Sequence, residues 1–345
     1  SFNDLWKIKV TLIDLEKKAF RSNLEENEIN ACLDYRFNLN SNGCPVIFDD
    51  LHLSKLVGYR VNFLRRASYY QNSFYRHYKI AKKAGGTRPI SEPLPSLKEI
   101  QRWIIDNILL NVPISKFAKA YKKNGSVFKH VFLHKNQELV FALDIKDFFR
   151  NINEEMIFKM FSDLGYTDHL SGILCKLCSL ENELAQGAPT SPMISNILLK
   201  EFDDLVGNEV VLRGGRYSRY ADDLTFSGNF NFSFDEVVIE VENRLNDLGF
   251  SLKEAKTKKM PNYRRQMVTG VVVNEKVQIS KKDRREIRQA CHYIKKFGLK
   301  NHLEKIGETR RNYTNHLIGR INFGLQMNPH DEELKSYKSL LEGLF

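Results

Sequence analysis

The chain has 345 residues, enough for more than one packed unit, and its 42% hydrophobic and 28% charged content fits an ordered protein. Its formal net charge of +11 favours a polyanionic partner such as nucleic acid. No stretch approaches the ~18 to 20 apolar residues that span a bilayer, and the 5 scattered cysteines do not suggest a disulfide framework. We therefore expect a cytoplasmic protein without a membrane partner.

The first third of the chain predicts helices followed by a hairpin. Residues 5–33 carry apolar positions at helical spacing, and residues 50–58 have the pattern of a short helix closed by glycine. Aromatic and basic residues alternate over 74–80 before the turn-forming pair Gly85-Gly86, which predicts a β-hairpin. Apolar residues on one face predict a helix over 96–110.

The middle of the chain mixes strands with helices. Residues 139–143 form an apolar run that predicts a buried strand. Asn153 is placed to cap a helix, and Pro192 suits the first position of another helix, where its missing N–H does no harm. Ser233 and Glu236 have the spacing of a capping box.

The last part predicts two paired strands, at 267–273 and 276–279, followed by helices at 281–297 and 309–325. Cys175 and Cys178 could be half of a zinc site, but no second pair lies near, so we expect a helix with both thiols facing the core. The mixture of elements predicts an α/β or α+β architecture.

The strongest chemical signal is Asp222-Asp223, which stands between strand-like segments. Exposed aspartate pairs are common in turns, but a pair wedged between apolar strands needs a cation to offset its charge. Asp144, at the end of another apolar strand, is a natural third ligand. Carboxylates suit Mg²⁺, and two such ions roughly 3.5 to 4 Å apart stabilise the attacking and leaving oxygens of a phosphoryl transfer.

Several motifs stand together in the order found in reverse transcriptases. They are Arg88-Pro89-Ile90, residues 143–149, residues 186–192, Tyr220-Ala221-Asp222-Asp223, and residues 248–250 with Lys256-Thr257. The chain resembles the retron-type branch of bacterial reverse transcriptases, whose kin include antiphage-defence enzymes. This resemblance implies a right-hand polymerase with an N-terminal helical region (1–58), fingers and an antiparallel-sheet palm (59–279), and a helical thumb (280–345).

The resemblance also implies an activity, namely copying a structured noncoding RNA into DNA by RNA-directed DNA polymerase chemistry. It implies two Mg²⁺ ions, which Mn²⁺ can replace, and deoxynucleoside triphosphates as substrates. The implied macromolecular partners are an RNA template and primer, the RNA–DNA product and an effector protein. Two other functions are compatible with the sequence. One is an RNA-directed RNA polymerase, against which Phe149 and Ala221 argue. The other is an RNA-binding scaffold, against which the three aspartates argue.

Site residues carry over from the resemblance, position by position. The metal-binding positions are Asp144, Ile145, Asp222 and Asp223. The nucleotide-binding positions are Lys83, Arg88, Phe149, Gln186 and Gly187, and those that contact nucleic acid are Lys281, Arg284, Arg285 and Arg288.

Some of these residues have specific roles in the resemblance. Phe149 corresponds to the steric gate that excludes a 2′-hydroxyl, although a phenylalanine is more often a core residue. Lys256 corresponds to the general acid that protonates pyrophosphate, although it and its neighbouring lysines also suit backbone phosphates. Arg88 and Lys83 would grip the triphosphate, and a solvated hairpin is the alternative for the lysine.

Two segments point to different branches of the family. The triplet Val268-Thr269-Gly270 matches retron enzymes, which extend a 2′-hydroxyl of their own RNA and leave a branched product. Retron enzymes usually carry Asn-Ala-x-x-His before the first catalytic aspartate, but here residues 130–134 match only at His134, which favours another defence enzyme. We expect His130 and His134 to pack or to contact RNA rather than to bind metal.

Overall fold

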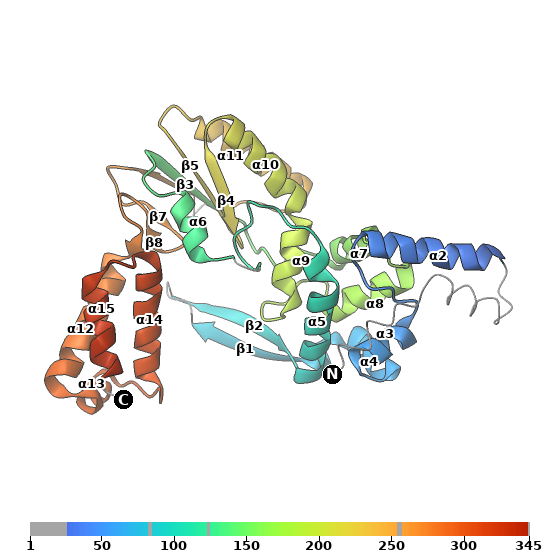
Figure 1. The fold of residues 1–345 in the computed structure, drawn as a ribbon, viewed down its shortest axis with the longest axis horizontal. Coiled ribbons are helices and arrows are strands. Elements are labelled where there is room, and N and C mark those ends of the chain that lie inside the picture. The colour runs from blue at the N-terminus through green and yellow to red at the C-terminus, as the bar shows by residue number, and fades with distance from the viewer. Residues whose placement is uncertain (1–25, 82–84, 123–124, 254–256, 344–345) are drawn as a thin grey trace. The chain divides into compact units, whose positions relative to one another are not determined.

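The computed structural model describes residues 26–81, 85–122, 125–253 and 257–343. These residues form a mixed α/β protein, as the sequence predicts (Figure 1). The chain divides into two compact units, the first formed by residues 1–113 and 149–198 and the second by residues 114–148 and 199–345. The predicted helix at 5–33 falls mostly outside the described residues, which include only its last part.

The first unit is mainly helical and carries one hairpin. Its helices are α2 (Glu26–Ser41), α3 (Asp50–Val57), α4 (Val61–Tyr69), η2 (Gln71–Phe74), α5 (Pro95–Asn107), η3 (Leu109–Asn111), α7 (Glu154–Asp163), α8 (Asp168–Cys178) and α9 (Thr190–Leu198). Its strands are β1 (Tyr75–Ala81) and β2 (Thr87–Pro93), which pair antiparallel and confirm the predicted hairpin.

The core of the first unit surrounds α5. Leu97, Ile100 and Ile104 are fully buried on one face of this helix, which packs against α8 and α9. The predicted helix at 96–110 is confirmed, but it ends at Asn107 and continues as the short 3₁₀ helix η3. Cys175 and Cys178 on α8 are buried, as predicted for a helix that turns its thiols to the core.

The second unit is built on a four-stranded antiparallel sheet with strand order β4-β5-β3-β6. The strands are β3 (Leu139–Asp144), β4 (Arg216–Tyr220), β5 (Asp223–Gly228) and β6 (Lys258–Pro261). The other elements are α6 (Val127–Leu133), α10 (Lys200–Leu212), α11 (Phe234–Asp247), β7 (Met267–Val268), β8 (Val271–Val272), β9 (Gln278–Ile279), α12 (Lys281–Phe297), α13 (Leu299–Ile306), α14 (Tyr313–Met327) and α15 (Glu332–Glu342).

Side chains of the sheet alternate between two covered faces, as the pleat of a strand requires. On one face the tilted rings of Tyr217 and Phe226 contact each other with a ring-centroid distance of 4.9 Å, and β4 packs against α10. On the other face Val140 and Met260 join a buried cluster with Val131 of α6 and the valines of the small β7-β8-β9 sheet. Both faces of the sheet therefore contribute to buried cores.

Two predictions about local structure in this unit are wrong. The strand predicted at 267–273 is instead a hairpin, because Thr269 and Gly270 adopt positive φ angles of 48° and 81° and turn the chain between β7 and β8. Ser233 precedes α11, but its side chain makes no capping hydrogen bond. The backbone of Ser233, with φ of -75° and ψ of 87°, is close to that of Asp331, which does cap α15, so backbone angles do not explain the missing bond.

Other helix termini agree with the sequence more closely. The side chain of Asn153 accepts a hydrogen bond from the backbone N–H of Met156 and caps α7, as predicted. Gly58 closes α3 in a left-handed conformation, also as predicted. The helix predicted to begin at Pro192 starts at Thr190 instead.

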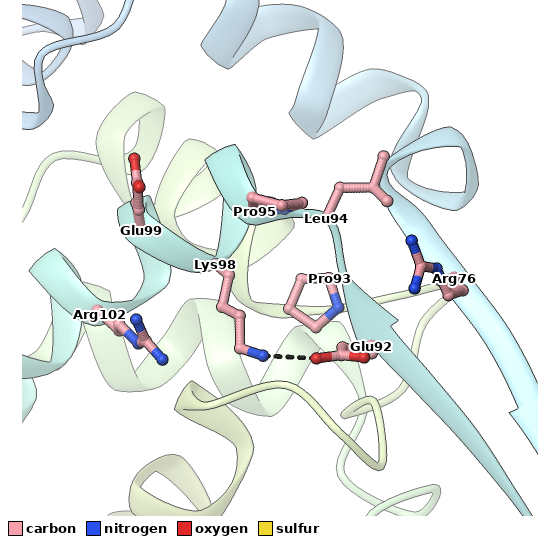
Figure 2. A pocket seen from close by; sticks show the side chains of 8 residues that line it. All are labelled: Arg76, Glu92, Pro93, Leu94, Pro95, Lys98, Glu99 and Arg102. Carbon is pink, nitrogen blue, oxygen red and sulfur yellow. Dashed lines mark hydrogen bonds and ion pairs between the residues drawn. The ribbon is translucent and has the colours of Figure 1, made fainter.

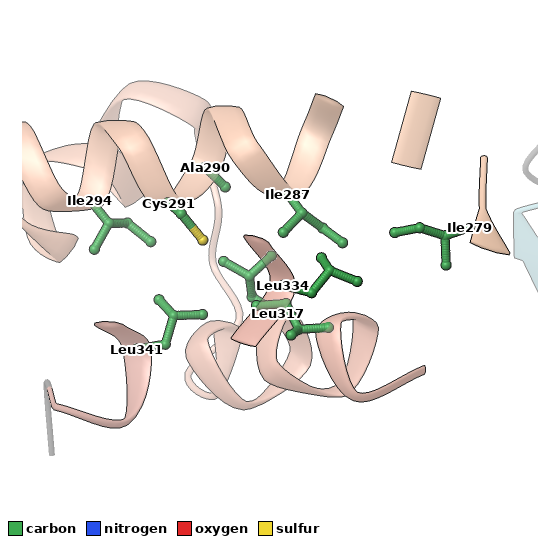
Figure 3. Packing of buried hydrophobic residues seen from close by; sticks show 9 residues of the cluster. Ile279, Ile287, Ala290, Cys291, Ile294, Leu317, Leu334 and Leu341 are labelled. Carbon is green, nitrogen blue, oxygen red and sulfur yellow. The ribbon is translucent and has the colours of Figure 1, made fainter. Parts of the chain in front are cut away.

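The four C-terminal helices α12 to α15 form one bundle (Figure 1). Ile287, Ile294, Leu317 and Leu341 are buried in the core of this bundle (Figure 3). The sequence analysis predicted two of these helices, which correspond to α12 and α14, and missed α13 and α15. In the part of the chain that the structure describes, no helix is both long and apolar enough to cross a membrane.

Candidate active site

Two of the predicted carboxylates are brought together by strand pairing. Asp144 is the last residue of β3 and Asp223 the first of β5, and the register of the antiparallel pair sets these two residues directly opposite each other. Asp144 is buried, with 5% of its surface exposed, and Asp223 is partly exposed. Two acidic residues therefore face each other at this end of the sheet. The sequence predicted one aspartate at the end of an apolar strand and an aspartate pair between two others.

The turn between β4 and β5 carries the remaining aspartate. Tyr220 pairs with Asp223, which leaves only Ala221 and Asp222 in the connection. Ala221 has a φ of 59°, a left-handed conformation that suits the first position of a tight hairpin turn, where glycine is usual. A residue with a Cβ pays about 1 to 2 kcal/mol for this conformation, so neighbouring contacts must stabilise it.

Backbone hydrogen bonds tie the aspartates to the loop that follows α11. The N–H of Ile145 donates to the carbonyl of Asp222 at 3.0 Å, and the N–H of Lys253 donates to the carbonyl of Asp144 at 2.8 Å. Ile145 also forms a β-bridge with Leu252. These hydrogen bonds fix the backbone at Asp144 and at Asp222.

The donor set suits a hard cation. Like charges that face each other on adjacent strands repel, and a divalent ion bound by carboxylate oxygens would offset this repulsion. Within the described ranges, no group of three or more His, Cys, Asp or Glu side chains is arranged to hold a metal ion. Asp144 and Asp223 nevertheless face each other across the β3–β5 pair, with Asp222 beside them in the turn.

A buried ion pair lies behind the turn. Arg219 and Asp203 are each 0% exposed, and their side chains meet at 2.7 Å between Nη2 and Oδ2. The hydroxyl of Tyr217 donates to Oδ1 of Asp203 at 2.7 Å. Burial alone would lower the pKa of Arg219, but the adjacent carboxylate of Asp203 outweighs it, and the pKa is raised. Arg219 therefore stays charged inside the unit.

Sequence reasoning did not single out Arg219 or Asp203. The spacing of Arg219 could have indicated its burial. It lies two residues after Tyr217 on the same strand, so both side chains face the same side of the sheet. An arginine on such a face requires a buried acidic partner.

Two histidines lie on the opposite face of the same hairpin. His130 and His134 of α6 are fully buried, and both contact the hydroxyl of Ser218 on β4 at 2.8 Å. His134 also contacts the hydroxyl of Ser227 on β5 at 2.7 Å. Of the two roles predicted for these histidines, packing and contact with RNA, their burial favours packing.

Burial makes both histidines weak bases. It lowers the pKa of His130 from its ordinary value of 6.5 to about 3, and it holds the pKa of His134 well below 6.5. Nearby Lys119 acts in the same direction on His130. Both rings are therefore neutral in the folded protein at neutral pH.

The stability of the protein should consequently fall in mild acid. The unfolded state binds protons at these histidines once the pH drops below 6.5, while the folded state resists until about pH 3 for His130. Above pH 6.5 the neutral histidines do not lower the free energy of unfolding. At pH 5 protonation of His130 in the unfolded state should lower it by about 2 kcal/mol. Urea titrations at several pH values measure this slope.

Two matched variants show whether His130 causes the pH dependence of stability. His130→Gln keeps hydrogen-bonding capacity without the titration, so its stability should depend less on pH between 6.5 and 5. His316→Gln, at an exposed position of α14, should leave the slope as it is in the parent. Equal slopes in the parent and in His130→Gln would contradict this assignment.

The predicted nucleotide-binding residues of the first unit are linked to each other. The N–H of Ser91 on β2 donates to the carbonyl of Gln186 at 2.8 Å, which fixes the loop before α9 to the strand that carries exposed Arg88. Gly187 has a φ of 130°, and a Cβ there would lie 2.8 Å from the carbonyl oxygen of Ser91. Only glycine therefore permits this close approach. The side-chain oxygen of Gln186 is buried and has no hydrogen-bond partner within the described chain.

Phe149 is the first residue of the first unit after the chain leaves the second. Its side chain is half-buried, and its carbonyl accepts hydrogen bonds from the N–H groups of Ile152 and Leu184 at 3.4 and 3.1 Å. Leu184 lies two residues before Gln186. The backbone of the predicted gate is thus connected to the loop predicted to bind the nucleotide.

The remaining predicted residues are found in different surroundings. Lys83 and Lys256 lie outside the described residues. Lys281 and Arg285 are exposed on α12. On the same helix Arg284 forms ion pairs with Asp331 and Glu333, and Arg288 pairs with Glu333 at 2.8 Å.

A shallow pocket of about 330 Å³ also lies in the first unit, beside the start of α5. Arg76, Lys98 and Arg102 line it together with Glu92 and Glu99, and Lys98 pairs with Glu92 at 2.5 Å (Figure 2). Its charges are mixed, and sequence reasoning did not predict it.

Comparison with known proteins adds family information to this geometry. Residues 80–307 match the family described as reverse transcriptase (RNA-dependent DNA polymerase). The retron Ec86 reverse transcriptase of Escherichia coli is 32% identical over 265 residues, which cover 75% of this chain and 82% of that protein. The retron Mx65 reverse transcriptase of Myxococcus xanthus is 28% identical over 84% of this chain and 71% of its own length.

Solved structures are more distant. A telomerase from Candida albicans is 10% identical over 77% of this chain and 60% of its own, with a TM-score of 0.42. A foamy viral protease-reverse transcriptase bound to double-stranded DNA is 12% identical over 77% of this chain and 43% of its own, also with a TM-score of 0.42.

Proposed function

This chain belongs to the reverse transcriptase family and, within it, to the retron reverse transcriptases; from this premise we propose that its RNA-directed DNA polymerase site is built on Asp144, Asp222 and Asp223. The observation that carries the proposal is the register of β3 and β5, which sets Asp144 directly opposite Asp223. Asp222 adjoins this pair in a two-residue turn.

The aspartates would act as oxygen ligands for divalent cations, here proposed to be two Mg²⁺ ions with Mn²⁺ as a substitute. Such cations, when bound, supply Lewis-acid stabilisation of the charge that develops as a primer hydroxyl attacks the α-phosphate. The protein's own part is to hold the carboxylates in place, and the hydrogen bonds of Ile145 and Lys253 support that role. Ile145 is also proposed as a ligand through its backbone.

Nucleotide selection would depend on residues of the first unit. We assign triphosphate binding to Arg88, whose guanidinium can donate two hydrogen bonds to phosphate oxygens, and to Lys83. Gln186 and Gly187 would lie under the nucleotide, and Phe149 would exclude a ribose hydroxyl. The fixed backbone of Phe149 and of the Gln186 loop supports these roles, because a selective pocket must be rigid. Lys256 is proposed to protonate the departing pyrophosphate.

The RNA would be bound through its phosphates by exposed basic residues of the C-terminal helices. Lys281 and Arg285 suit this role because they are exposed on α12. Arg284 and Arg288 keep a proposed role as well, although acidic residues of α15 already pair with them. The domain boundaries predicted at residues 58 and 279 remain proposals, as does a role in antiphage defence with an effector protein.

The nature of the product tests the retron function. Protein purified from cells should carry one short DNA of defined sequence, joined to RNA by a 2′,5′ linkage, because a retron enzyme primes synthesis on an RNA 2′-hydroxyl. Debranching enzyme should then change the mobility of this DNA on a gel, whereas protease should not.

The contrary outcome is equally specific. DNA that resists debranching enzyme and shifts with protease would mean that a protein hydroxyl, and not RNA, is the primer. A preparation from cells expressing the Asp222→Ala/Asp223→Ala variant gives the background, because it should contain the RNA without attached DNA.

A further inference from the structure

Arg219 is the largest fully buried side chain among the residues that the structure describes. A guanidinium can remain in such a place only if acceptors satisfy its N–H groups. Asp203 of α10 accepts from Nε at 3.0 Å and from Nη2 at 2.7 Å. The third nitrogen, Nη1, donates instead to the backbone carbonyl of Ala221 at 3.1 Å. Arg219 therefore links α10 to the turn that carries the aspartates.

The position of this hydrogen bond is informative. The carbonyl of Ala221 belongs to the peptide group that precedes Asp222, and the carbonyl of Asp222, in the peptide group that follows, accepts from Ile145 at 3.0 Å. Both peptide groups that flank Asp222 are thus held by hydrogen bonds. The orientation of these two groups sets the direction in which the Asp222 side chain leaves the backbone.

The backbone of Arg219 is also held by hydrogen bonds, and its guanidinium lies near an aromatic ring. Its N–H donates to the carbonyl of Phe117 at 3.0 Å, and its carbonyl accepts from Lys119 at 2.8 Å. The guanidinium lies 6.0 Å from the centre of the Phe148 ring. A group anchored in this way can hold the left-handed conformation of Ala221, which would otherwise relax.

We propose that Arg219 is a positioning residue for DNA synthesis, which holds the Ala221 carbonyl and thereby aims the carboxylate of Asp222. This inference rests on the proposed function, because it assumes that Asp222 is a metal ligand. Asp203 serves the same purpose indirectly, since it fixes the guanidinium. Neither residue touches the reacting groups.

Arg219→Lys is the first test, because lysine can still pair with Asp203 but lacks the fork that reaches two acceptors at once. We expect kcat to fall by about 100-fold, the cost of moving a catalytic group by roughly 1 Å. The KM for deoxynucleotides and the affinity for RNA should stay at parental values. Affinity for Mn²⁺, measured by electron paramagnetic resonance of the free ion, should weaken by about tenfold or more, as when the partner that orients a metal ligand is lost.

Tyr217→Phe provides the matched control. It removes a hydrogen bond to the same buried Asp203, from the same strand, without touching the Ala221 carbonyl. Its melting temperature should fall, whereas kcat and Mn²⁺ affinity should remain parental. If both variants lose activity in proportion to their loss of melting temperature, Arg219 is only a core residue and the inference is overturned.

Ala221→Gly gives a second, independent test. Glycine adopts the left-handed conformation without penalty, so the turn would depend less on Arg219. We expect Arg219→Lys/Ala221→Gly to recover part of the kcat that Arg219→Lys loses, relative to Ala221→Gly alone. Absence of any recovery, or failure of Arg219→Lys to fold in both backgrounds, would contradict the proposal.

The failure of this inference differs from that of the proposed function. If Asp222→Ala/Asp223→Ala abolishes synthesis while Arg219→Lys retains the parental kcat, only the role of Arg219 is wrong. If the aspartate variant still makes DNA, the site itself is wrong.

Discussion

DNA synthesis should fall by about a thousandfold or more when Asp222 and Asp223 are both replaced by alanine, because the several kcal/mol of charge stabilisation that bound metals supply would be lost. The fold should survive the change. Both side chains are partly exposed, and removal of Asp223 relieves its repulsion with Asp144 on the neighbouring strand. Primer extension on an RNA template, together with the melting temperature and RNA affinity, measures the separate effects.

A charge-matched control shows that the effect is local. Asp235→Ala/Glu236→Ala removes the same number of carboxylates from the exposed first turn of α11. This control should synthesise DNA at the parental rate. Ordinary synthesis by the Asp222→Ala/Asp223→Ala variant would show that another group of residues binds the catalytic metals.

Ribonucleotides should enter the product when Phe149 is replaced by valine. The proposed gate fills the space beside the 2′ carbon, and losing several methylene-sized groups from such a contact should relax the discrimination by about 10- to 200-fold. The backbone hydrogen bonds of Phe149 to Ile152 and Leu184 do not involve its ring, so the loop should keep its geometry. The ratio of kcat/KM for a deoxynucleotide and its ribonucleotide counterpart measures the change.

Phe158→Val is the control for this variant. Phe158 is also half-buried in the first unit, on α7, so its replacement should lower stability to a similar degree without changing sugar selection. A Phe149→Val protein that folds and discriminates as strictly as the parent would assign Phe149 to the core alone.

The sequence predicted the pairing of the aspartates for a physical reason. An apolar strand that ends in Asp144 and a hairpin that turns at Asp222 both belong to one antiparallel sheet, so their polar ends meet at one edge. Strong local signals of this kind, such as the glycine pair of the first hairpin or the Asn153 cap, were also reliable.

What the sequence did not predict depends on contacts between distant segments. Asp203 and Arg219 are 16 residues apart and belong to different elements, and nothing in either local pattern indicates their pairing. The ion pairs of Arg284 and Arg288 are similar, because their acidic partner Glu333 lies 45 or more residues away, on α15. Ser233 shows the reverse case, in which the residues have the spacing of a capping box but the capping hydrogen bond does not form.

The division of the chain into two discontinuous units has a consequence for synthesis on the ribosome. Each unit is built from two segments that are separated in the sequence by a segment of the other unit. Neither unit is therefore complete when its first segment emerges from the ribosome. Helix α5 leaves the ribosome before its packing partners α8 and α9 have been translated. The part of its apolar face that packs against α8 and α9 must therefore stay uncovered until residue 198 is made, which exposes the nascent chain to aggregation during this interval.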